Sequence, residues 1–340
     1  MKIGILNGGG DCAGLNAVTR AVVRKSEQFG YDMVGIRHGW AGLLNVDTCS
    51  LKWTDVSEII KVGGTILYTT RTNPFSRKEG GETVLANVKK LGLDVVIAVG
   101  GEDTLSVAAK LARMGLKVVG VPKTIDNDIV ATDVTFGFDS AVNVTVDAID
   151  RIQTTGESHN RIMIVEVMGR HAGWIAAYSG IASGANLILI PEEPFNLEDV
   201  SKFLKQRHDA GATASVVVVG EGCSLKGSPP GDPTKVDEFG HARLGGIGDL
   251  LAKEIERRTG IETRAVVLGH VVRGGAPSAY DRILATRLGL AAVQAVKVGE
   301  FGVMVCLRNN AISTVPLSDI LGKMKDVDTE TVSLVKDFCV

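Results

Sequence analysis

The chain has 340 residues, enough for two domains of ordinary size or one large one, and its 45% hydrophobic and 22% charged residues are those of a soluble globular protein. A net charge of −2 and an aromatic content of 5% argue against a nucleic-acid partner, since such binders are normally basic and stack bases on aromatic rings. No apolar run approaches the ~18–20 residues that cross a bilayer, so we expect no membrane partner.

Short apolar runs that end in glycine or proline recur along the chain. These predicted strands are 2–6, 94–99, 117–121, 162–167, 186–190 and 215–219. Several lead directly into helical spacing, and strands that are apolar throughout and alternate with helices predict a parallel sheet covered on both faces. The fold class is therefore α/β, doubly wound, and ligands are expected at the carboxyl ends of the strands.

Three further segments bear on the organisation of the chain. The helical pattern of 139–152 is expected to cross between two lobes. The stretch 226–240 has three prolines and three glycines, which predicts a surface loop. The tail 320–340 has partly amphipathic helical spacing, and we expect it to pack on the second lobe.

The first candidate phosphate site is 8-GGGDCAGLNAVTRAVVRK-25, directly after the first predicted strand. Consecutive glycines let a backbone approach an oxyanion closely, and a helix from about Leu15 would point its N-terminal amides at that anion. No GK[ST] follows, so this is not a Walker A loop. The alternative is a tight strand-to-helix turn without a ligand.

The second candidate is 100-GGEDT-104, where two carboxylates stand at the position expected for an anion. In one interpretation Asp103 or Thr104 simply caps the next helix, and Glu102 is a solvated acid. In the other, Glu102 is a magnesium ligand, because Mg²⁺ prefers one or two carboxylates together with phosphate oxygens.

The third candidate is 121-VPKTIDNDIVATDVTFGFDSA-141, in which Asp126 and Asp128 follow a strand and Lys123 lies three residues before Asp126. An acid held near a cation and a metal is suited to taking a proton from a hydroxyl nucleophile. A solvated polar loop is the alternative.

Basic residues near apolar runs form a further group. They are Arg71, Arg161, Arg170, Arg264, His270 and Arg273. Arg170 and Arg273 stand out because each follows a strand-like run and sits near glycine. Histidine and arginine beside a glycine turn suit a sugar phosphate, and several such residues suggest two phosphates, one on each substrate.

The five cysteines are scattered and form no CxxC pair, which predicts a reduced intracellular protein without a disulfide framework or a zinc site. Glycines interrupt the N-terminal apolar run too early for a signal peptide. We therefore expect a cytoplasmic protein.

Taken together, the motifs resemble the 6-phosphofructokinase family. GGGDCAGLNA, GGEDT, PKTIDND, HNRIMIVEVMGRHAGWIA, and ETRAVVLGHVVRGG with PSAYDR occur in the family's order between about residues 3 and 290. GGEDT alone is also similar to the loop of NAD kinases and lipid kinases, but those proteins are not expected to carry PKTIDND. A non-catalytic sensor on the same fold is disfavoured because Asp126, Asp128 and Glu102 are all present.

The resemblance implies two similar lobes with the active site in the cleft between them. Residues 1–138 with about 251–308 would bind the phosphoryl donor, and 139–250 with about 309–340 would bind fructose 6-phosphate. Asp126 matches the base that takes the proton from the sugar 1-hydroxyl.

The resemblance also implies roles for the other site residues. Thr124 and Asp128 match neighbours of the base that bind the sugar and position the transferred group. Gly10 matches the donor loop, and Arg71 matches a cation that stabilises the transition state. Glu102 matches the carboxylate that holds Mg²⁺. The implied sugar contacts are Arg161, Met168, Gly169, Arg170, Glu221, Arg264, His270 and Arg273, with Arg170 also counted as catalytic. Arg161 and Arg264 are expected to reach into a neighbouring subunit's site, which implies a homodimer or homotetramer.

Two departures concern the donor. ATP-using members typically have glycine in place of Asp103, and often in place of Lys123. A carboxylate there would repel the α-phosphate of ATP, by roughly 1 kcal/mol in water and about 4 at an effective dielectric of 20 for charges ~4 Å apart. Pyrophosphate has no α-phosphate, and Lys123 could neutralise its leaving group. The pair resembles the pyrophosphate-dependent branch, with an ATP-dependent enzyme as the alternative.

Overall fold

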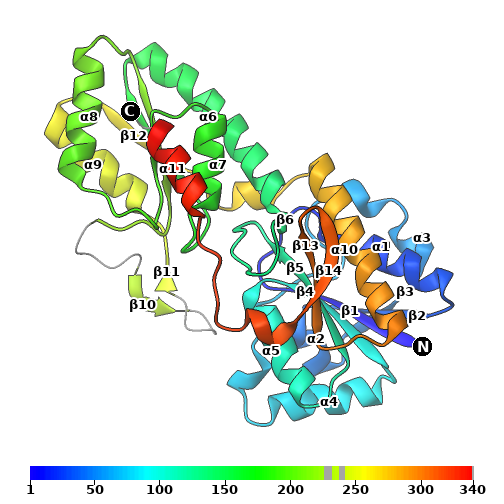
Figure 1. Cartoon of the computed structure of the whole chain (residues 1–340). Helices are drawn as coiled ribbons and strands as arrows, with labels where there is room; N and C mark the ends of the chain where they lie inside the picture. The colour runs from blue at the N-terminus through cyan, green and yellow to red at the C-terminus, as the bar shows by residue number, and fades with distance from the viewer. Residues whose placement is uncertain (226–231, 237–241, 339–340) are drawn as a thin grey trace. The chain divides into compact units, whose positions relative to one another are not determined.

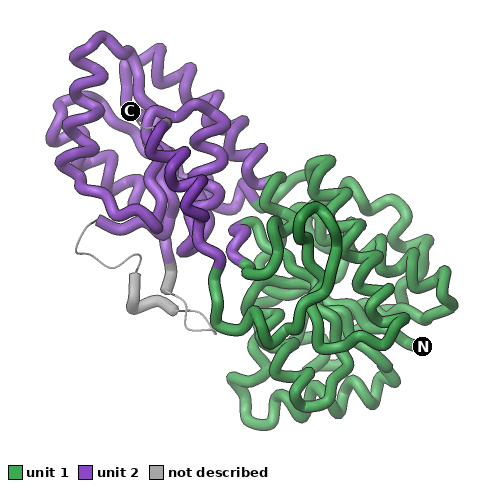
Figure 2. The backbone as a smooth tube through the Cα atoms, viewed as in Figure 1, with its two compact units in different colours: residues 1–125, 129–140, 273–324 green, residues 126–128, 141–272, 325–340 purple. Residues whose placement is uncertain are grey.

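The computed structural model describes residues 1–225, 232–236 and 242–338. They form two compact units, which Figure 2 shows in different colours. Unit 1 comprises Met1–Ile125, Ile129–Ser140 and Arg273–Met324. Unit 2 comprises Asp126–Asp128, Ala141–Val272 and Lys325–Val340. Each unit is described by itself below.

The units differ from the predicted lobes at four points. The crossing expected at 138 falls after Ser140, the chain returns to unit 1 at Arg273 rather than about 251, and it leaves again after Met324 rather than about 308. In addition, Asp126–Asp128 belong to unit 2, although they lie within the predicted segment 1–138. The second difference arises because the helix at 247–259 packs in the core of unit 2. The third arises because the strand at 311–316 pairs within the sheet of unit 1.

The sheet of unit 1 has the strand order β14-β13-β5-β4-β1-β2-β3, with β6 paired to β5. The bounds are β1 Lys2–Gly8, β2 Asp32–Ile36, β3 Thr48–Leu51, β4 Val95–Gly100, β5 Val118–Thr124, β6 Phe136–Gly137, β13 Val303–Arg308 and β14 Ala311–Pro316. The central strands β2, β1, β4, β5 and β13 are parallel, and β3 and β14 add antiparallel edges. Every residue of β4 and β5 is buried, as expected for parallel strands covered on both faces.

Helices cover the sheet of unit 1, with α1 and α10 on one face and α4 and α5 on the other (Figure 1). The helices and 3₁₀ turns of the unit are α1 Leu15–Gln28, α2 Trp40–Asn45, α3 Trp53–Val56, η1 Ile59–Lys61, η2 Pro74–Ser76, α4 Gly80–Lys90, α5 Glu102–Arg113, α10 Ala279–Val298 and η4 Leu317–Ile320. The α1–α10 contact requires glycine at 289, because a Cβ there would lie 2.9 Å from the carbonyl oxygen of Val18.

The main sheet of unit 2 is parallel, in the order β12-β7-β9-β8. Its elements are α6 Phe138–His159, which begins in unit 1, β7 Ile162–Val167, α7 Trp174–Ala182, β8 Leu187–Leu189, α8 Leu197–Asp209, β9 Ser215–Gly220, α9 Ile247–Thr259, β12 Thr263–Val267, η3 Gly269–Arg273 and α11 Thr329–Phe338. Ile164 and Val217 from the strands and Leu251 and Ile255 from α9 are fully buried in one core cluster. The six strands predicted from the sequence are confirmed as β1, β4, β5, β7, β8 and β9.

Two predicted segments differ in detail. The surface loop predicted at 226–240 lies partly outside the described residues, but 232–236 forms β10 (Asp232–Val236), antiparallel to β11 (Ala242–Arg243). The loop prediction is therefore wrong for that part. In the tail, helix α11 begins only at Thr329.

Over the described ranges, the structure has no helix that is both long and apolar enough to cross a membrane. Of the five cysteines, Cys12, Cys49, Cys223 and Cys306 lie in the described part of the chain, and all four are free thiols.

Candidate active site

Three of the sequence motifs meet at one edge of the sheet in unit 1. The strand register pairs Gly8 of β1 with Gly100 of β4, and Gly100 with Pro122 of β5. The ends of these neighbouring strands therefore carry the triple-glycine turn, the GGEDT turn and Lys123. This is the edge at which ligands bind in parallel α/β sheets.

The triple-glycine turn is bonded to the segment that precedes Arg71. The Gly9 N–H donates to the carbonyl oxygen of Thr70 at 3.0 Å. The hydroxyl of Thr69 donates to the carbonyl oxygen of Gly9 at 2.6 Å. Gly9 has φ = 79°, in the left-handed region that favours glycine. These bonds hold Thr69 and Thr70 against the turn, and Arg71 is the next residue along the chain.

Two cations lie against the same turn. Lys123 is only 3% exposed, and its Nζ donates to the carbonyl oxygen of Gly10. Arg273, 8% exposed, donates from Nη1 to the carbonyl oxygen of Asp11 at 3.1 Å. A Cβ on Gly10 would lie 2.1 Å from that Nη1, so the turn needs glycine there to admit the guanidinium.

The second glycine turn leads into α5. Its N-cap is Gly101, and no described side chain caps the helix, so the expectation that Asp103 or Thr104 caps it is wrong. Glu102 and Asp103 instead occupy the first turn, where the helix dipole favours negative charge. The hydroxyl of Ser106 donates to Oε1 of Glu102 at 2.6 Å.

Thr104 explains two of the glycines by packing rather than by ligand binding. Its side chain is buried, and a Cβ on Gly8 would lie 2.5 Å from its Oγ1, while a Cβ on Gly100 would lie 2.3 Å from its Cβ. Gly101 is different, since a Cβ there would lie 3.6 Å from the nearest atom, the carbonyl oxygen of Lys123. Packing against Thr104 therefore accounts for Gly8 and Gly100 but not for Gly101.

The segment after β5 carries the predicted base. Thr124, Asp126 and Asn127 are all buried, and Asn127 adopts φ = 54°. The hydroxyl of Thr135 donates to the carbonyl oxygen of Thr124 at 2.9 Å. Thr124 belongs to unit 1, while residues 126–128 belong to unit 2.

In unit 2, the turn at 168–170 follows β7 and is held by Glu221, the residue that follows β9. Oε1 of Glu221 accepts hydrogen bonds from the N–H groups of Gly169 (3.3 Å) and Arg170 (3.1 Å). Burial raises the pKa of the Glu221 carboxyl, the negative charge of Asp126 raises it further, and the two N–H bonds partly offset this. Asp126 and Glu221 therefore interact electrostatically within unit 2.

Glu166, a buried carboxylate inside β7, organises the other side of this turn. Its side chain accepts hydrogen bonds from the N–H groups of Gly246 (3.0 and 3.1 Å) and Gly248 (2.8 Å), at the start of α9. Its carbonyl oxygen accepts from the N–H of Leu268 at 3.1 Å, just before the turn that carries His270. Glu166 was not predicted as a site residue, although an acid within the apolar run IMIVEV is a detectable signal.

Arg161 and Arg264 lie together beside β12, the edge strand of the sheet in unit 2. Both contact Oε1 of Glu262, at 2.8 Å from Arg161 and 2.5 Å from Arg264. Arg264 also lies 3.4 Å from Glu256. The hydrogen bond from Arg161 lowers the pKa of the Glu262 carboxyl, and the positive charge of Arg264 adds to the effect.

The predicted residues thus form two sets, one in each unit. Unit 1 holds Gly10, Arg71, Glu102, Asp103, Lys123, Thr124 and Arg273. Unit 2 holds Asp126, Asp128, Arg161, Met168, Gly169, Arg170, Glu221, Arg264 and His270. Within the described ranges no three His, Cys, Asp or Glu side chains are grouped so that they could hold a metal ion by themselves.

The chain was compared with known proteins. A family model described as phosphofructokinase matches residues 2–296. A pyrophosphate–fructose 6-phosphate 1-phosphotransferase from Amycolatopsis methanolica is 54% identical over 332 residues, 97% of each chain. ATP-dependent 6-phosphofructokinase 3 from Streptomyces coelicolor is 49% identical over 329 residues, 96% of each chain. A crystal structure of pyrophosphate-dependent phosphofructokinase from Marinobacter aquaeolei has a TM-score of 0.83 at 25% identity and covers 97% of this chain and 86% of that one. With a family model that spans most of its length, this chain belongs to the phosphofructokinase family.

Proposed function

We propose that the protein is a pyrophosphate-dependent phosphofructokinase. It transfers a phosphoryl group from pyrophosphate to the 1-hydroxyl of fructose 6-phosphate and releases fructose 1,6-bisphosphate and phosphate. The observation that carries the choice of donor is the position of Asp103 in the first turn of α5, with buried Lys123 at the end of the adjacent strand. The relative from Amycolatopsis methanolica supports it by its name.

The donor argument is electrostatic and steric. An ATP molecule placed along the GGEDT turn would bring its α-phosphate and nucleoside to the carboxylate of Asp103, whereas pyrophosphate would not. Lys123 donates to the carbonyl oxygen of Gly10, so a positive charge lies at the triple-glycine turn for the phosphate groups of the donor. Arg273, a proposed sugar contact, lies against the same turn through the carbonyl oxygen of Asp11. Gly10 leaves the room that this arrangement needs.

The residues of the acceptor side have separate tasks. Asp126 takes the proton of the 1-hydroxyl, Thr124 and Asp128 position the reacting groups, and Arg71 and Arg170 stabilise the charge that spreads over the transferred group. Glu221 fixes the 168–170 turn through two backbone N–H groups, so that Met168, Gly169 and Arg170 hold the sugar. Arg273 completes the set of phosphate-binding cations.

Glu102 is the proposed carboxylate ligand of Mg²⁺. One protein carboxylate with phosphate oxygens and water is a ligand set that Mg²⁺ prefers, and the described residues hold no all-protein cage. When bound, the ion neutralises charge on the phosphate oxygens. Glu102 itself is held by Ser106, which fixes the direction of its carboxylate.

The sugar site is proposed to be completed by a second copy of the chain. Arg161 and Arg264 lie together at the edge strand β12, where they pair with glutamates rather than with the 168–170 turn. In a homodimer or homotetramer they would bind the sugar phosphate of the neighbouring subunit together with that subunit's own copies of His270 and Arg273. Because pyrophosphate and the sugar ester store similar energy, the reaction should run in both directions and serve glycolysis and gluconeogenesis. We expect the enzyme in the cytoplasm.

The second candidate is an ATP-dependent phosphofructokinase, which the 49% identical relative from Streptomyces coelicolor favours by its name. The reverse reaction distinguishes the two. Fructose 1,6-bisphosphate, Mg²⁺ and inorganic phosphate should yield pyrophosphate and fructose 6-phosphate, seen by ³¹P NMR. Turnover that requires ADP and gives none with phosphate would reject the pyrophosphate proposal.

A further inference from the structure

The C-terminal tail contacts the segment that carries the proposed base, and both belong to unit 2. The N–H of Lys325 donates to the carbonyl oxygen of Asp128 at 2.8 Å. Its Nζ donates to Oδ1 of Asn127 at 2.9 Å. Residues almost 200 positions apart in the sequence therefore fix the two residues that follow Asp126.

Trp174, at the start of α7, fixes Lys325 in turn. Its indole Nε1 donates to the carbonyl oxygen of Lys325 at 2.9 Å. The Nζ of Lys325 also lies 5.2 Å from the centre of the Trp174 ring, within the range of a cation–π contact. Lys325 thus has its backbone and its side chain both held, so its ammonium reaches Asn127 from a defined position.

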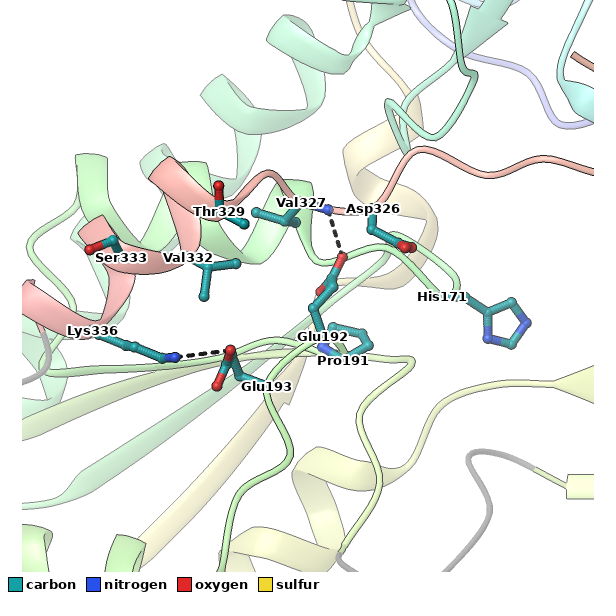
Figure 3. Close-up of a pocket in the computed structure, with 10 residues that line it drawn as sticks. All are labelled: His171, Pro191, Glu192, Glu193, Asp326, Val327, Thr329, Val332, Ser333 and Lys336. Carbon is teal, nitrogen blue, oxygen red and sulfur yellow. Dashed lines mark hydrogen bonds and ion pairs between the residues drawn. The ribbon is translucent and has the colours of Figure 1, made fainter. Parts of the chain in front are cut away.

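The next residues of the tail are anchored as well. Figure 3 shows the N–H of Val327 on Glu192, at 3.0 Å from Oε1, and Lys336 paired with Glu193 at 2.9 Å. Glu192 also accepts the N–H of Gly173, the N-cap of α7. Glu192, Glu193, Val327 and Lys336 are among the residues that line a cavity of about 610 Å³ between α11 and the segment after β8. These anchors hold the tail on the C-terminal side of Lys325, close to the residue that contacts Asn127.

Asn127 is a residue for which such support matters. It is 2% exposed and has φ = 54°, a left-handed conformation that costs energy for any residue with a Cβ, although asparagine tolerates it better than most. Backbone in such a conformation persists when its surroundings fix it. The side-chain bond from Lys325 and the backbone bond at Asp128 supply part of that fixation.

We infer that Lys325 is a positioning residue for phosphoryl transfer: from the C-terminal tail it holds Asn127 and Asp128, and through them the direction of the Asp126 and Asp128 carboxylates. The inference rests on the proposed function, because it assigns the base to Asp126. Lys325 itself touches neither substrate. Small displacements of a catalytic group lower the rate of the chemical step more than they weaken binding.

The test compares Lys325→Met with a matched control, Lys323→Met, an exposed lysine two residues earlier in the same connection. Lys325→Met removes the ammonium but keeps the backbone bond to Asp128. We expect kcat to fall about tenfold, the factor that corresponds to ~1.4 kcal/mol, with the KM of both substrates within about twofold of wild type. Lys325→Arg should recover most of the rate, since it retains a cation and donors. Lys323→Met should match wild type.

A second measurement separates positioning from loss of folded protein and from failure of the proposed function. Hydrogen exchange of peptides covering 124–132 should be faster in Lys325→Met than in Lys323→Met, with similar melting temperatures. Rates are measured with pyrophosphate and with ATP, so the comparison holds whichever donor is used. If wild type turns over neither donor, the proposed function fails, and a role in phosphoryl transfer fails with it; exchange then shows only whether Lys325 fixes the segment 127–128. Unchanged exchange together with unchanged kcat would overturn the inference.

Discussion

Asp103 occupies the second position of α5, where the helix amides favour negative charge. A negative charge at this position would repel an α-phosphate. Lys123 lies on the neighbouring strand, and its ammonium is buried against the triple-glycine turn. In the proposed function, the choice of donor depends on these two charges of opposite sign, which lie at adjacent strand ends.

Asp103→Gly should raise kcat/KM for ATP by about tenfold or more, because a repulsion of ~1–4 kcal/mol and the bulk of the carboxylate are both removed. Asp103→Asn, which keeps the size but not the charge, separates the two contributions. Steady-state rates with each donor measure the effect. No gain in ATP use with either variant would mean that another residue excludes the nucleotide.

Asp126→Asn should lower kcat by about 10²–10⁴-fold, the usual contribution of a positioned general base, with the KM for fructose 6-phosphate nearly unchanged. Asp133→Asn, at an exposed carboxylate near the same segment, is the control. Single-turnover rates distinguish the chemical step from product release. An Asp126→Asn enzyme with wild-type kcat would show that another group accepts the proton.

The sequence indicated which candidate residues lie at the ends of strands but not all of their surroundings. Glu102, Asp103 and Lys123 follow strands whose buried apolar runs are visible in the sequence, so their meeting at one sheet edge was predictable. The contact of Arg273 with the turn at Asp11 was not, since it joins residues 262 positions apart. The same holds for Lys325, whose partner Asn127 no local pattern identifies.

At the scale of elements, the β4–α5 connection combines a packing requirement with a binding surface. Thr104 fills the space over Gly8 and Gly100, while Gly101 faces a gap wide enough for an ordinary contact. Packing against Thr104 therefore requires glycine at 100 but not at 101, although the two residues are neighbours in one motif.

Gly100→Ala should destabilise the protein by about 1–3 kcal/mol, because its Cβ would lie 2.3 Å from the Cβ of Thr104 and the core would have to move. Gly101→Ala is the matched control: its φ of −76° suits alanine, and its Cβ would meet the nearest atom at 3.6 Å. Urea unfolding of both variants measures the difference. Equal stability of the two would contradict the packing role of Thr104.

Among the elements, buried parallel strands were the most predictable because their apolar runs and glycine ends are local signals. The antiparallel edges β3 and β14 were not predicted, since their residues are partly exposed and mixed in character. Strand β10 was assigned to a loop because prolines and glycines surround it. One interpretation of GGEDT gave α5 a side-chain cap from Asp103 or Thr104, whereas the N-cap residue is Gly101.

At the scale of the whole molecule, the chain passes between its two units several times. The crossing near 138 was predicted from the start of a long helix. The later crossings were expected at about 251 and 308 and lie at Arg273 and after Met324, because composition does not reveal that α9 belongs to the core of unit 2 or that β14 pairs with β13. Which elements share a core is decided by packing between distant segments.

A buried hydrogen-bond network in unit 1 joins Ser140, the last residue before one of these crossings, to Ser278 and Asp281 at the start of α10. Oδ2 of Asp281 accepts the N–H of Ser140 at 2.8 Å and its hydroxyl at 2.5 Å. The hydroxyl of Ser140 in turn accepts the N–H of Ser278, the N-cap of α10. Burial raises the pKa of the Asp281 carboxyl to about 6, from an ordinary value of 3.8, although the bonds from Ser140 act in the opposite direction.

This pKa predicts a pH dependence of stability. Since the folded state binds the Asp281 proton more tightly than the unfolded state, the stabilisation is fully present below pH ~4 and is lost as the pH rises through about 6. Relative to Asp281→Asn, wild type should therefore lose stability between about pH 4 and 6. Urea unfolding across that range measures it. A difference that stays constant with pH would contradict the raised pKa.

The most direct test of the account is a comparison of donors with the purified protein, Mg²⁺ and fructose 6-phosphate. We predict that kcat/KM for pyrophosphate exceeds that for ATP by more than about tenfold, the factor expected from the repulsion at Asp103. A preference for ATP would contradict the electrostatic argument at Asp103 and Lys123, and with it the proposed donor.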